Sequence, residues 1–285
     1  MDLVWKAALQ GVIQGITEFL PVSSSAHLLL LGDLLDLGHD KFVKLFNILV
    51  HFASILAVVI YFSRVLFPAA AFRLLAVPVS AHRSEIMKDP ALRNWFDLCV
   101  KIALGFLPIA VIGFVAAKLD WKDHLDEQPW IRVGALLAGG ILLLVIERWC
   151  RQEKPAQTIA ELSYRAALLI GLAQCLAIIP GMSRSASTIL AALALGAARP
   201  LAAEFSFLVA IPTMVGASAY SLLKFHGSLS RQEWIALAVG SAVTFLVSLS
   251  VVSWLMNYLR THTFELFGWY RIALAIAVAC WLWFD

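Results

Sequence analysis

The residues best suited to chemistry lie in two short stretches, each inside a run of apolar sequence. Residues 14–27 read QGITEFLPVSSSAH, and residues 174–188 read QCLAIIPGMSRSAST. Polar and ionisable groups are costly in hydrocarbon, so within a membrane protein they usually face a cavity and mark a site. Both stretches have the form of an apolar helix, a proline break, a serine cluster and a second apolar helix. We expect the two breaks to meet and to build one anion site.

The second stretch carries the groups that suit an anion. Its serine cluster follows the break, at the expected N-terminus of a helix, where free N–H groups and a partial positive charge favour phosphate. Arg184 adds a permanent cation with a planar fork of donors that matches phosphate oxygens. Ser183, Ser185 and Thr188 add hydroxyl donors, and Ser23 follows the first break in the same way. The alternative roles are helix capping for the hydroxyl residues and interfacial snorkelling for Arg184.

The first stretch carries the groups that can exchange protons. Glu18 is a candidate general base, or a ligand for Mg²⁺ or Ca²⁺, which prefer oxygen. His27 can serve as a general acid, a base or a phosphoryl-accepting nucleophile, with a satisfied polar contact as the alternative. Gln14 lies one helical turn before Glu18 and shares its face, where it can orient substrate or water. His51 lies in the middle of an apolar span with no clear partner, so we expect packing or a polar contact there rather than catalysis.

Composition indicates which class of protein positions these groups. The chain has 285 residues, of which 61% are hydrophobic and 14% charged, and its mean hydropathy is +0.84. A soluble domain normally carries about a quarter charged residues. The sequence therefore predicts an all-α, polytopic integral membrane protein. Its net charge of +3 is too small to indicate nucleic-acid binding.

Hydropathy predicts six transmembrane helices and two shorter hairpins. The apolar runs on either side of Pro21 and Pro180 are each too short to span a bilayer, which takes roughly 20 residues. We therefore expect two re-entrant helical hairpins, since irregular backbone is tolerated at membrane depth only inside protein or a wet cavity. The full spans are expected at residues 42–63, 95–118, 130–147, 202–223, 233–256 and 267–284.

Loop charge predicts the orientation. Basic loops mark the cytoplasmic side, which places residues 64–92 and 148–165 inside and the acidic loop 119–129 outside. The first hairpin then enters from the outside, and we expect a multi-pass protein whose site opens to the outer side of the membrane.

An internal repeat relates the two halves. GVIQ at 11–14 matches GLAQ at 171–174, Pro21 matches Pro180, and FNILVHFAS at 46–54 resembles FSFLVAIPT at 205–213, at offsets of 159 or 160 residues. Each copy holds one hairpin and three spans. Because three is odd, the second copy inserts upside down, as in inverted-topology repeats with sites between broken helices. We predict one membrane domain, 1–285, built from repeat one (1–150) and repeat two (160–285); chance similarity of apolar segments is the alternative.

At these two stretches the chain resembles the undecaprenyl-diphosphate phosphatase family of the bacitracin-resistance type. Gln14 to Glu18 fits the family's (E/Q)xxxE motif, which FLPVSSSAH follows, and residues 180–188 fit its PGxSRSxxT motif. The resemblance implies a hydrolase of the bacterial inner membrane, with its site open to the periplasmic side. It would remove the terminal phosphate of undecaprenyl diphosphate, with a divalent cation, to recycle the carrier lipid for peptidoglycan synthesis. It assigns active-site positions to Glu18, Ser24, His27, Ser183, Arg184, Ser185 and Thr188.

The chain departs from the family pattern at a few positions. Gln14 stands where many members have Glu, which removes one carboxylate available to a metal. Ser25-Ala26 and Ala186-Ser187 stand where Thr-Gly and Gly-Ala are common, which alters local packing.

The predicted substrate is a polyprenyl diphosphate lipid held in the bilayer. Arg184 and the two helix ends would hold the diphosphate, and a metal near Glu18 would offset its charge. The sequence leaves open whether His27 or Ser24 is the nucleophile, and whether the protein is a homodimer.

A transporter or flippase for a lipid or a phosphate-bearing solute is the alternative function, because inverted repeats with broken helices are typical of secondary transporters. A structural membrane subunit is a third, weaker interpretation.

Overall fold

The structure is a computed structural model, and it describes residues 2–35, 41–72, 88–119, 128–149 and 155–284, with positions 82, 86 and 125 between them. Regular structure across these residues is helical, apart from one isolated bridge between Ala156 and Ala197. The predicted all-α class is confirmed. Residues 73–81, 120–124 and 150–154 of the charged loops lie outside the described residues, so the orientation drawn from those loops stays a prediction.

Six helices are long and apolar enough to cross a membrane, as predicted. They are α3 (Lys41–Tyr61), α7 (Pro90–Lys118), α9 (Pro129–Trp149), α12 (Arg199–Leu223), α13 (Arg231–Tyr258) and α14 (Glu265–Phe284). The prediction placed the start of α7 at residue 95, five residues too late. Asp89 caps the helix by accepting from Ala91 N, and Pro90 occupies its first position, where a missing N–H costs nothing.

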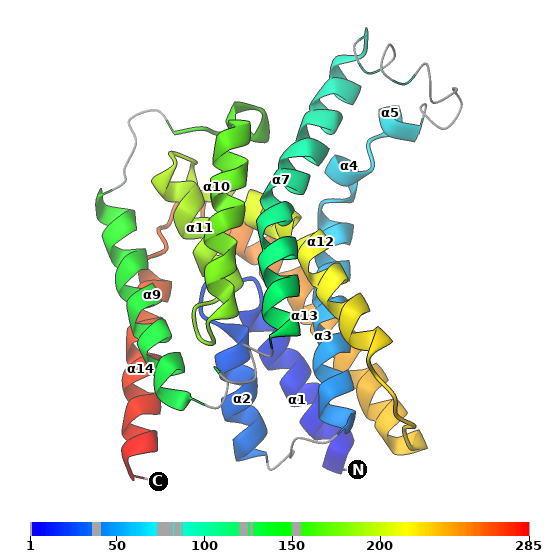
Figure 1. Cartoon of the computed structure of the whole chain (residues 1–285), viewed down its shortest axis with the longest axis vertical. Coiled ribbons are helices and arrows are strands. Elements are labelled where there is room, and N and C mark those ends of the chain that lie inside the picture. Colours follow the sequence, from blue (N-terminus) through cyan, green and yellow to red (C-terminus); the bar gives the residue numbers. More distant parts are fainter. Residues whose placement is uncertain are drawn as a thin grey trace.

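Four shorter helices form two hairpins. The first is α1 (Asp2–Thr17) with α2 (Ser24–Leu34), and the second is α10 (Tyr164–Gln174) with α11 (Arg184–Ala194), joined through the 3₁₀ turn η3 (Cys175–Ile178). In Figure 1 the α1–α2 hairpin occupies the lower half and α10–α11 the upper half, with their turns facing each other near mid-height. The longest of the four has 16 residues, fewer than the roughly 20 that a span needs. The other short helices among the described residues are α4 (Ser63–Leu66), α5 (Ala69–Phe72) and η2 (Ile159–Glu161).

Each hairpin packs against a span from the other half of the chain: α1 lies on α13, and α10 lies on α7. Both crossings are glycine contacts. A Cβ atom on Gly11 would lie 2.5 Å from the Gly240 carbonyl oxygen, and one on Gly171 would collide with the Gly105 carbonyl. Small residues let helix backbones approach closely in membranes. Such matched crossings are what an internal repeat would produce, and the inverted insertion of the second half stays a prediction.

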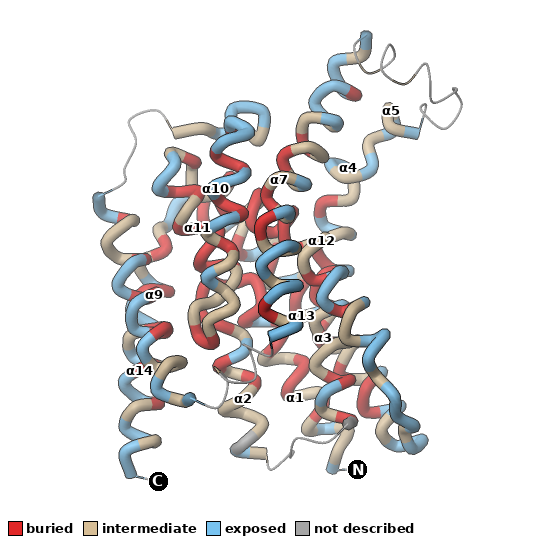
Figure 2. The backbone as a smooth tube through the Cα atoms, in the orientation of Figure 1, coloured by how far each residue is buried: buried red, intermediate tan, exposed pale blue. Residues whose placement is uncertain are grey.

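Burial is greatest where the two hairpin turns meet. Figure 2 shows buried backbone concentrated at the centre of the bundle and exposed residues along the outer sides of α9 and α14. Phe19 of the first break and Phe207 of α12 are both fully buried there, with ring centroids 5.2 Å apart in an edge-to-face contact. The exposed positions on the outer helices include many large apolar side chains, such as Leu142 and Ile276. Such an outer surface suits hydrocarbon, while the centre positions the polar residues.

Candidate active site

The two breaks share one backbone feature, a serine with positive φ directly before a helix. Ser23 has φ of 73° and Ser183 has φ of 71°, and within the described residues they are the two non-glycine residues with positive φ. Each directly precedes a helix, α2 or α11. A non-glycine residue is rare in this region and persists only where its surroundings enforce it, often at functional sites. The two strained serines therefore aim two helix N-termini into the centre of the molecule.

Glu18 lies at the centre of the contacts between the breaks. Its Oε2 accepts hydrogen bonds from Gln14 Nε2 at 2.9 Å and from Ser24 Oγ at 2.8 Å. Its Oε1 accepts from Arg184 Nη2 at 2.9 Å, and His51 Nε2 lies 3.6 Å from Oε2. The Glu18 side chain is only 6% exposed. A carboxylate at that burial requires charged and polar partners, and this one draws them from both breaks and from α3.

Arg184 reaches across the interface between the hairpins. Besides Glu18, it donates to Ser206 O at 3.4 Å and lies over the ring of Phe19. Its side chain is 12% exposed. The single bond to Glu18 leaves the planar fork without a bidentate carboxylate partner, so the guanidinium remains suited to an incoming phosphate.

The hydroxyl groups of the second break bind mainly to the protein itself. Ser185 Oγ donates to Leu20 O at 2.9 Å, which ties the second break directly to the first. Thr188 Oγ1 lies 2.6 Å from Ser206 Oγ and is fully buried. Ser183 Oγ caps α11 by accepting from Ala186 N at 3.3 Å. These contacts hold the two breaks in place. Substrate binding by Ser183, Ser185 and Thr188 stays a prediction.

The serine cluster of the first break is divided between two environments. Ser23 is 1% exposed, and its Oγ lies 3.3 Å from Ser25 Oγ. Ser24 is half-buried and is the serine whose hydroxyl donates to Glu18. Of the two candidate nucleophiles, Ser24 is therefore the one in hydrogen-bond contact with a carboxylate base.

His27 lies in a separate group of contacts. Its Nδ1 is 2.8 Å from Ser23 O, and its Nε2 is 2.7 Å from the hydroxyl of Tyr270 on α14. The rings of His27 and Tyr270 are nearly parallel, with centroids 5.7 Å apart. The ring is half-buried beside the break.

Arg271 is a residue that the sequence analysis missed. It is fully buried, and its donors go to backbone carbonyls of both breaks: Pro21 O at 3.2 Å, Gly181 O at 3.0 Å and Met182 O at 3.1 Å. It also donates to the carbonyls of Ala135 and Leu136 on α9. The sequence did contain a signal for Arg271, because it is an ionisable residue inside the apolar run 267–284, and the same property identified Arg184.

Tyr270 and His51 were also outside the predicted site. Tyr270 sits at the start of an apolar span, where an aromatic residue normally indicates an interface belt. The sequence provided no partner for His51, and the structure supplies Glu18. Only the folded arrangement of α3 beside the first break shows that this mid-span histidine belongs to the group around Glu18.

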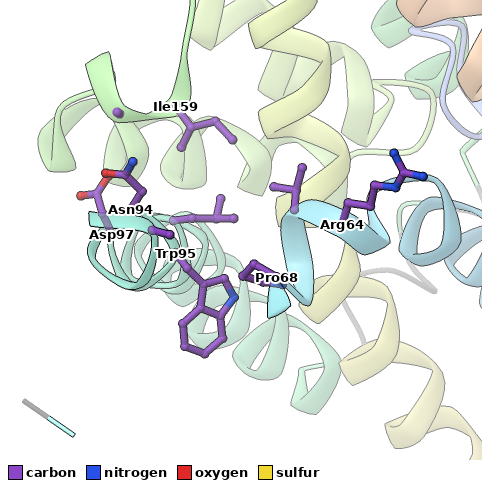
Figure 3. A pocket seen from close by; sticks show the side chains of 10 residues that line it. Arg64, Pro68, Asn94, Trp95, Asp97 and Ile159 are labelled. Atoms are coloured by element: carbon purple, nitrogen blue, oxygen red, sulfur yellow. The ribbon is translucent and has the colours of Figure 1, made fainter. Parts of the chain in front are cut away.

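Two cavities lie apart from Glu18 and Arg184. One of about 250 Å³ lies between α4, α7 and η2 and is lined by residues that include Arg64, Trp95 and Asp97 (Figure 3). The other, about 190 Å³, is almost entirely apolar and includes Leu142, Met182, Ser187 and Leu190 in its lining. The second cavity borders the break, because Met182 and Ser187 flank Arg184 in the sequence.

The whole chain is similar to one family of membrane proteins. Residues 7–277 match the family model described as bacitracin resistance protein BacA. "Undecaprenyl-diphosphatase" of Aquifex aeolicus (strain VF5) is 37% identical over 281 residues, which cover 98% of this chain and 99% of the relative. "Undecaprenyl-diphosphatase 1" of Clostridioides difficile (strain 630) is 40% identical over 277 residues, with 96% and 94% covered. "Undecaprenyl-diphosphatase" of Enterococcus faecalis is 39% identical over 280 residues, with 96% and 95% covered.

Proposed function

This chain belongs to the bacitracin resistance protein BacA family, and we propose that it is a membrane phosphatase acting on undecaprenyl diphosphate. The products are undecaprenyl phosphate and inorganic phosphate, which recycles the carrier lipid for peptidoglycan synthesis. The observation that carries the proposal is the 2.9 Å contact of Arg184 with Glu18, which joins a cation and a base from two breaks at one buried point.

Binding of the diphosphate follows from the charges at the two breaks. Arg184 and the N-termini of α2 and α11 provide positive potential for the phosphate groups. Glu18 and the substrate are both anionic, so they compete for the guanidinium. When Arg184 turns to a phosphate oxygen, Glu18 loses its ionic partner and becomes a stronger proton acceptor for the hydroxyl already bonded to it.

The geometry supports Ser24 as the attacking group. Ser24 Oγ would form a bond to the terminal phosphorus while the bond from that phosphorus to the bridging oxygen breaks, which releases undecaprenyl phosphate. The hydroxyl proton passes to Glu18 Oε2, 2.8 Å away. Glu18 then releases that proton to solvent, and water attacks the phosphoserine as the bond from phosphorus to Ser24 Oγ breaks. Glu18 takes the proton from the water and returns it to Ser24 Oγ, and inorganic phosphate leaves. Phosphoryl transfer depends mainly on positioning and charge stabilisation, which the two breaks provide. His27 remains the rival nucleophile.

The residues present fit a divalent cation shared with the substrate. Gln14 Oε1 is buried and has no hydrogen-bond partner in the described part of the chain, and it belongs to the amide whose nitrogen contacts Glu18. No group of three His, Cys, Asp or Glu residues able to hold a metal occurs among the described residues. Mg²⁺ is usually held by one or two protein oxygens together with substrate phosphates and water. Glu18 and Gln14 would hold Mg²⁺ or Ca²⁺, which would neutralise charge on the diphosphate.

The apolar cavity beside the second break supports a lipid substrate. Its lining, which includes Leu142, Met182 and Leu190, would suit part of the hydrocarbon chain of a lipid bound next to the break. We place the protein in the bacterial inner membrane with the site open to the periplasmic side, and a homodimer stays a prediction. The names of the relatives support hydrolysis, and they lend no support to the transporter or flippase alternative.

Phosphate release from undecaprenyl diphosphate tests the function. Purified protein in detergent is assayed with and without Mg²⁺ or Ca²⁺, beside Arg184→Ala. Arg148→Ala is the matched control, because Arg148 is 60% exposed and forms a surface pair with Glu265. We expect cation-dependent release that collapses in Arg184→Ala and persists in Arg148→Ala. Absence of release under every cation, from folded protein that binds the lipid, would contradict the proposal and favour transport.

A further inference from the structure

Both ring nitrogens of His27 have partners, and the partners fix the tautomer. Ser23 O, 2.8 Å from Nδ1, is a carbonyl oxygen that can only accept, so Nδ1 carries a hydrogen. In the neutral ring Nε2 is then the acceptor, and the Tyr270 hydroxyl, 2.7 Å away, donates to it. A reaction that uses His27 as an acid, base or nucleophile must therefore use Nε2, the nitrogen that Tyr270 occupies.

The position of Tyr270 is fixed by its neighbour in the chain. Arg271 is fully buried and donates to Pro21 O in the first break and to Gly181 O in the second. These bonds hold this turn of α14 against both breaks. The Tyr270 hydroxyl is consequently presented to His27 by a helix that cannot shift without breaking contacts at both hairpin turns.

Packing alone does not account for the hydroxyl of Tyr270. The residue is 46% exposed, so a phenylalanine could fill its place without leaving a cavity. The ring contact with His27 would survive in phenylalanine. The feature that tyrosine adds here is the bond to Nε2.

We propose that Tyr270 is a positioning residue for His27. Its hydroxyl donates to Nε2 while Nδ1 is bonded to Ser23 O in the break, so the two bonds together fix the ring. The hydroxyl occupies Nε2 until substrate or water replaces the bond. This inference rests on the proposed phosphatase function for its kinetic consequence, while the contact itself can be tested without any activity.

The test combines chemical labelling with kinetics on Tyr270→Phe. Diethyl pyrocarbonate acylates an unprotonated imidazole nitrogen, so its reaction with His27, followed by mass spectrometry, reports the availability of Nε2. His226, which is exposed, is the internal reference. Tyr258→Phe is the matched control, since Tyr258 stacks on a different histidine, His262, at 4.3 Å.

In Tyr270→Phe we expect labelling of His27 to rise roughly threefold or more relative to His226. The kcat for phosphate release should fall roughly three- to tenfold, because the ring loses one of its two anchors, with KM nearly unchanged. Tyr258→Phe should leave both unchanged. Tyr270→Met, which also lacks the hydroxyl, provides the same readout if the phenylalanine variant does not fold.

Two results would overturn the inference. Unchanged labelling would mean that Tyr270 does not occupy Nε2 in the folded protein. Increased labelling with unchanged kcat would mean that the bond exists and has no part in the reaction. A wild-type protein that releases no phosphate would instead contradict the proposed function, and the labelling result would still decide whether the contact forms.

Discussion

The two breaks share one backbone feature and differ in their chemistry. Both place a serine with φ near 70° before a helix, and in both the Oγ atoms of two serines spaced two residues apart lie close, at 3.3 Å and 3.1 Å. The first break supplies the groups that exchange protons, Glu18 and Ser24. The second supplies Arg184 and hydroxyls that bind the protein. The comparison shows one backbone feature placed before two helices, α2 and α11. In the proposed mechanism the first break transfers protons and the second binds the anion.

The largest expected effect is a loss of kcat, and it distinguishes Ser24 from His27 as the residue of the first break that attacks phosphorus. Ser24→Ala should reduce kcat by roughly 10³-fold or more, because it removes the hydroxyl bonded to Glu18. His27→Ala should cost roughly 10²-fold, as expected for a residue that assists proton transfer. Phosphate release from undecaprenyl diphosphate measures both. Substantial activity in Ser24→Ala together with none in His27→Ala would make His27 the nucleophile.

Arg271 tests whether one residue holds the two breaks together. Arg271→Met leaves carbonyls of Pro21, Gly181 and Met182 without their donor, and we expect a loss of about 3 kcal/mol or more in stability. Thermal unfolding in detergent measures the effect, and Arg271→Lys should recover part of it. The exposed Arg148→Ala is the control. Equal unfolding temperatures for Arg271→Met and wild type would mean that the breaks assemble without this arginine.

The glycine crossings test whether each hairpin depends on its contact with the other half. Gly171→Ala places a Cβ against the Gly105 backbone and should destabilise the protein by about 1–3 kcal/mol. Gly134→Ala, where a Cβ meets nothing within 4 Å, should be neutral or stabilise α9 by up to about 1 kcal/mol. Thermal unfolding compares the two. If both variants behave alike, close contact between α10 and α7 is not what holds the second hairpin.

The smallest effect concerns the cation. Gln14→Glu adds a second carboxylate beside Glu18 and should lower the cation concentration for half-maximal activity by roughly three- to tenfold, because Mg²⁺ and Ca²⁺ prefer carboxylate oxygens. The measurement is phosphate release across a Mg²⁺ series, after chelator treatment. Gln10→Glu, one turn earlier on α1, is the control. An unchanged cation requirement in Gln14→Glu would remove Gln14 from the metal site.

The broad fold could be predicted because each of its features has a local cause. Pro21 and Pro180 each lie in a break between two short helices, whereas Pro108 and Pro212 lie inside the long spans α7 and α12. The two breaks were recognisable because each proline is followed by a serine cluster, and apolar runs of span length form spans. The prediction that the two breaks meet is confirmed by the bonds of Arg184 to Glu18 and of Ser185 to Leu20. This contact could be predicted because polar groups inside hydrocarbon are stable only when they contact other polar groups.

The detail of the site could not be predicted, because it depends on which helix faces lie together. Arg271 is 250 residues from Pro21 in the chain, and nothing local indicates that its donors reach that carbonyl. The substrate contact expected of Thr188 stays a prediction, and its hydroxyl lies 2.6 Å from that of Ser206, a residue that no motif includes. His51 contacts Glu18 only because α3 packs beside the first break. Such contacts are consequences of tertiary packing rather than of sequence spacing.

A double-mutant cycle on Glu18 and Arg184 tests most directly whether the two breaks form one site. The cycle compares kcat/KM for phosphate release in Glu18→Gln, Arg184→Ala and the double variant. If the two residues act as a unit, each single variant should lose most of the activity, and the double variant should lose little more than either. Losses that multiply in the double variant would show two independent sites and would contradict the account.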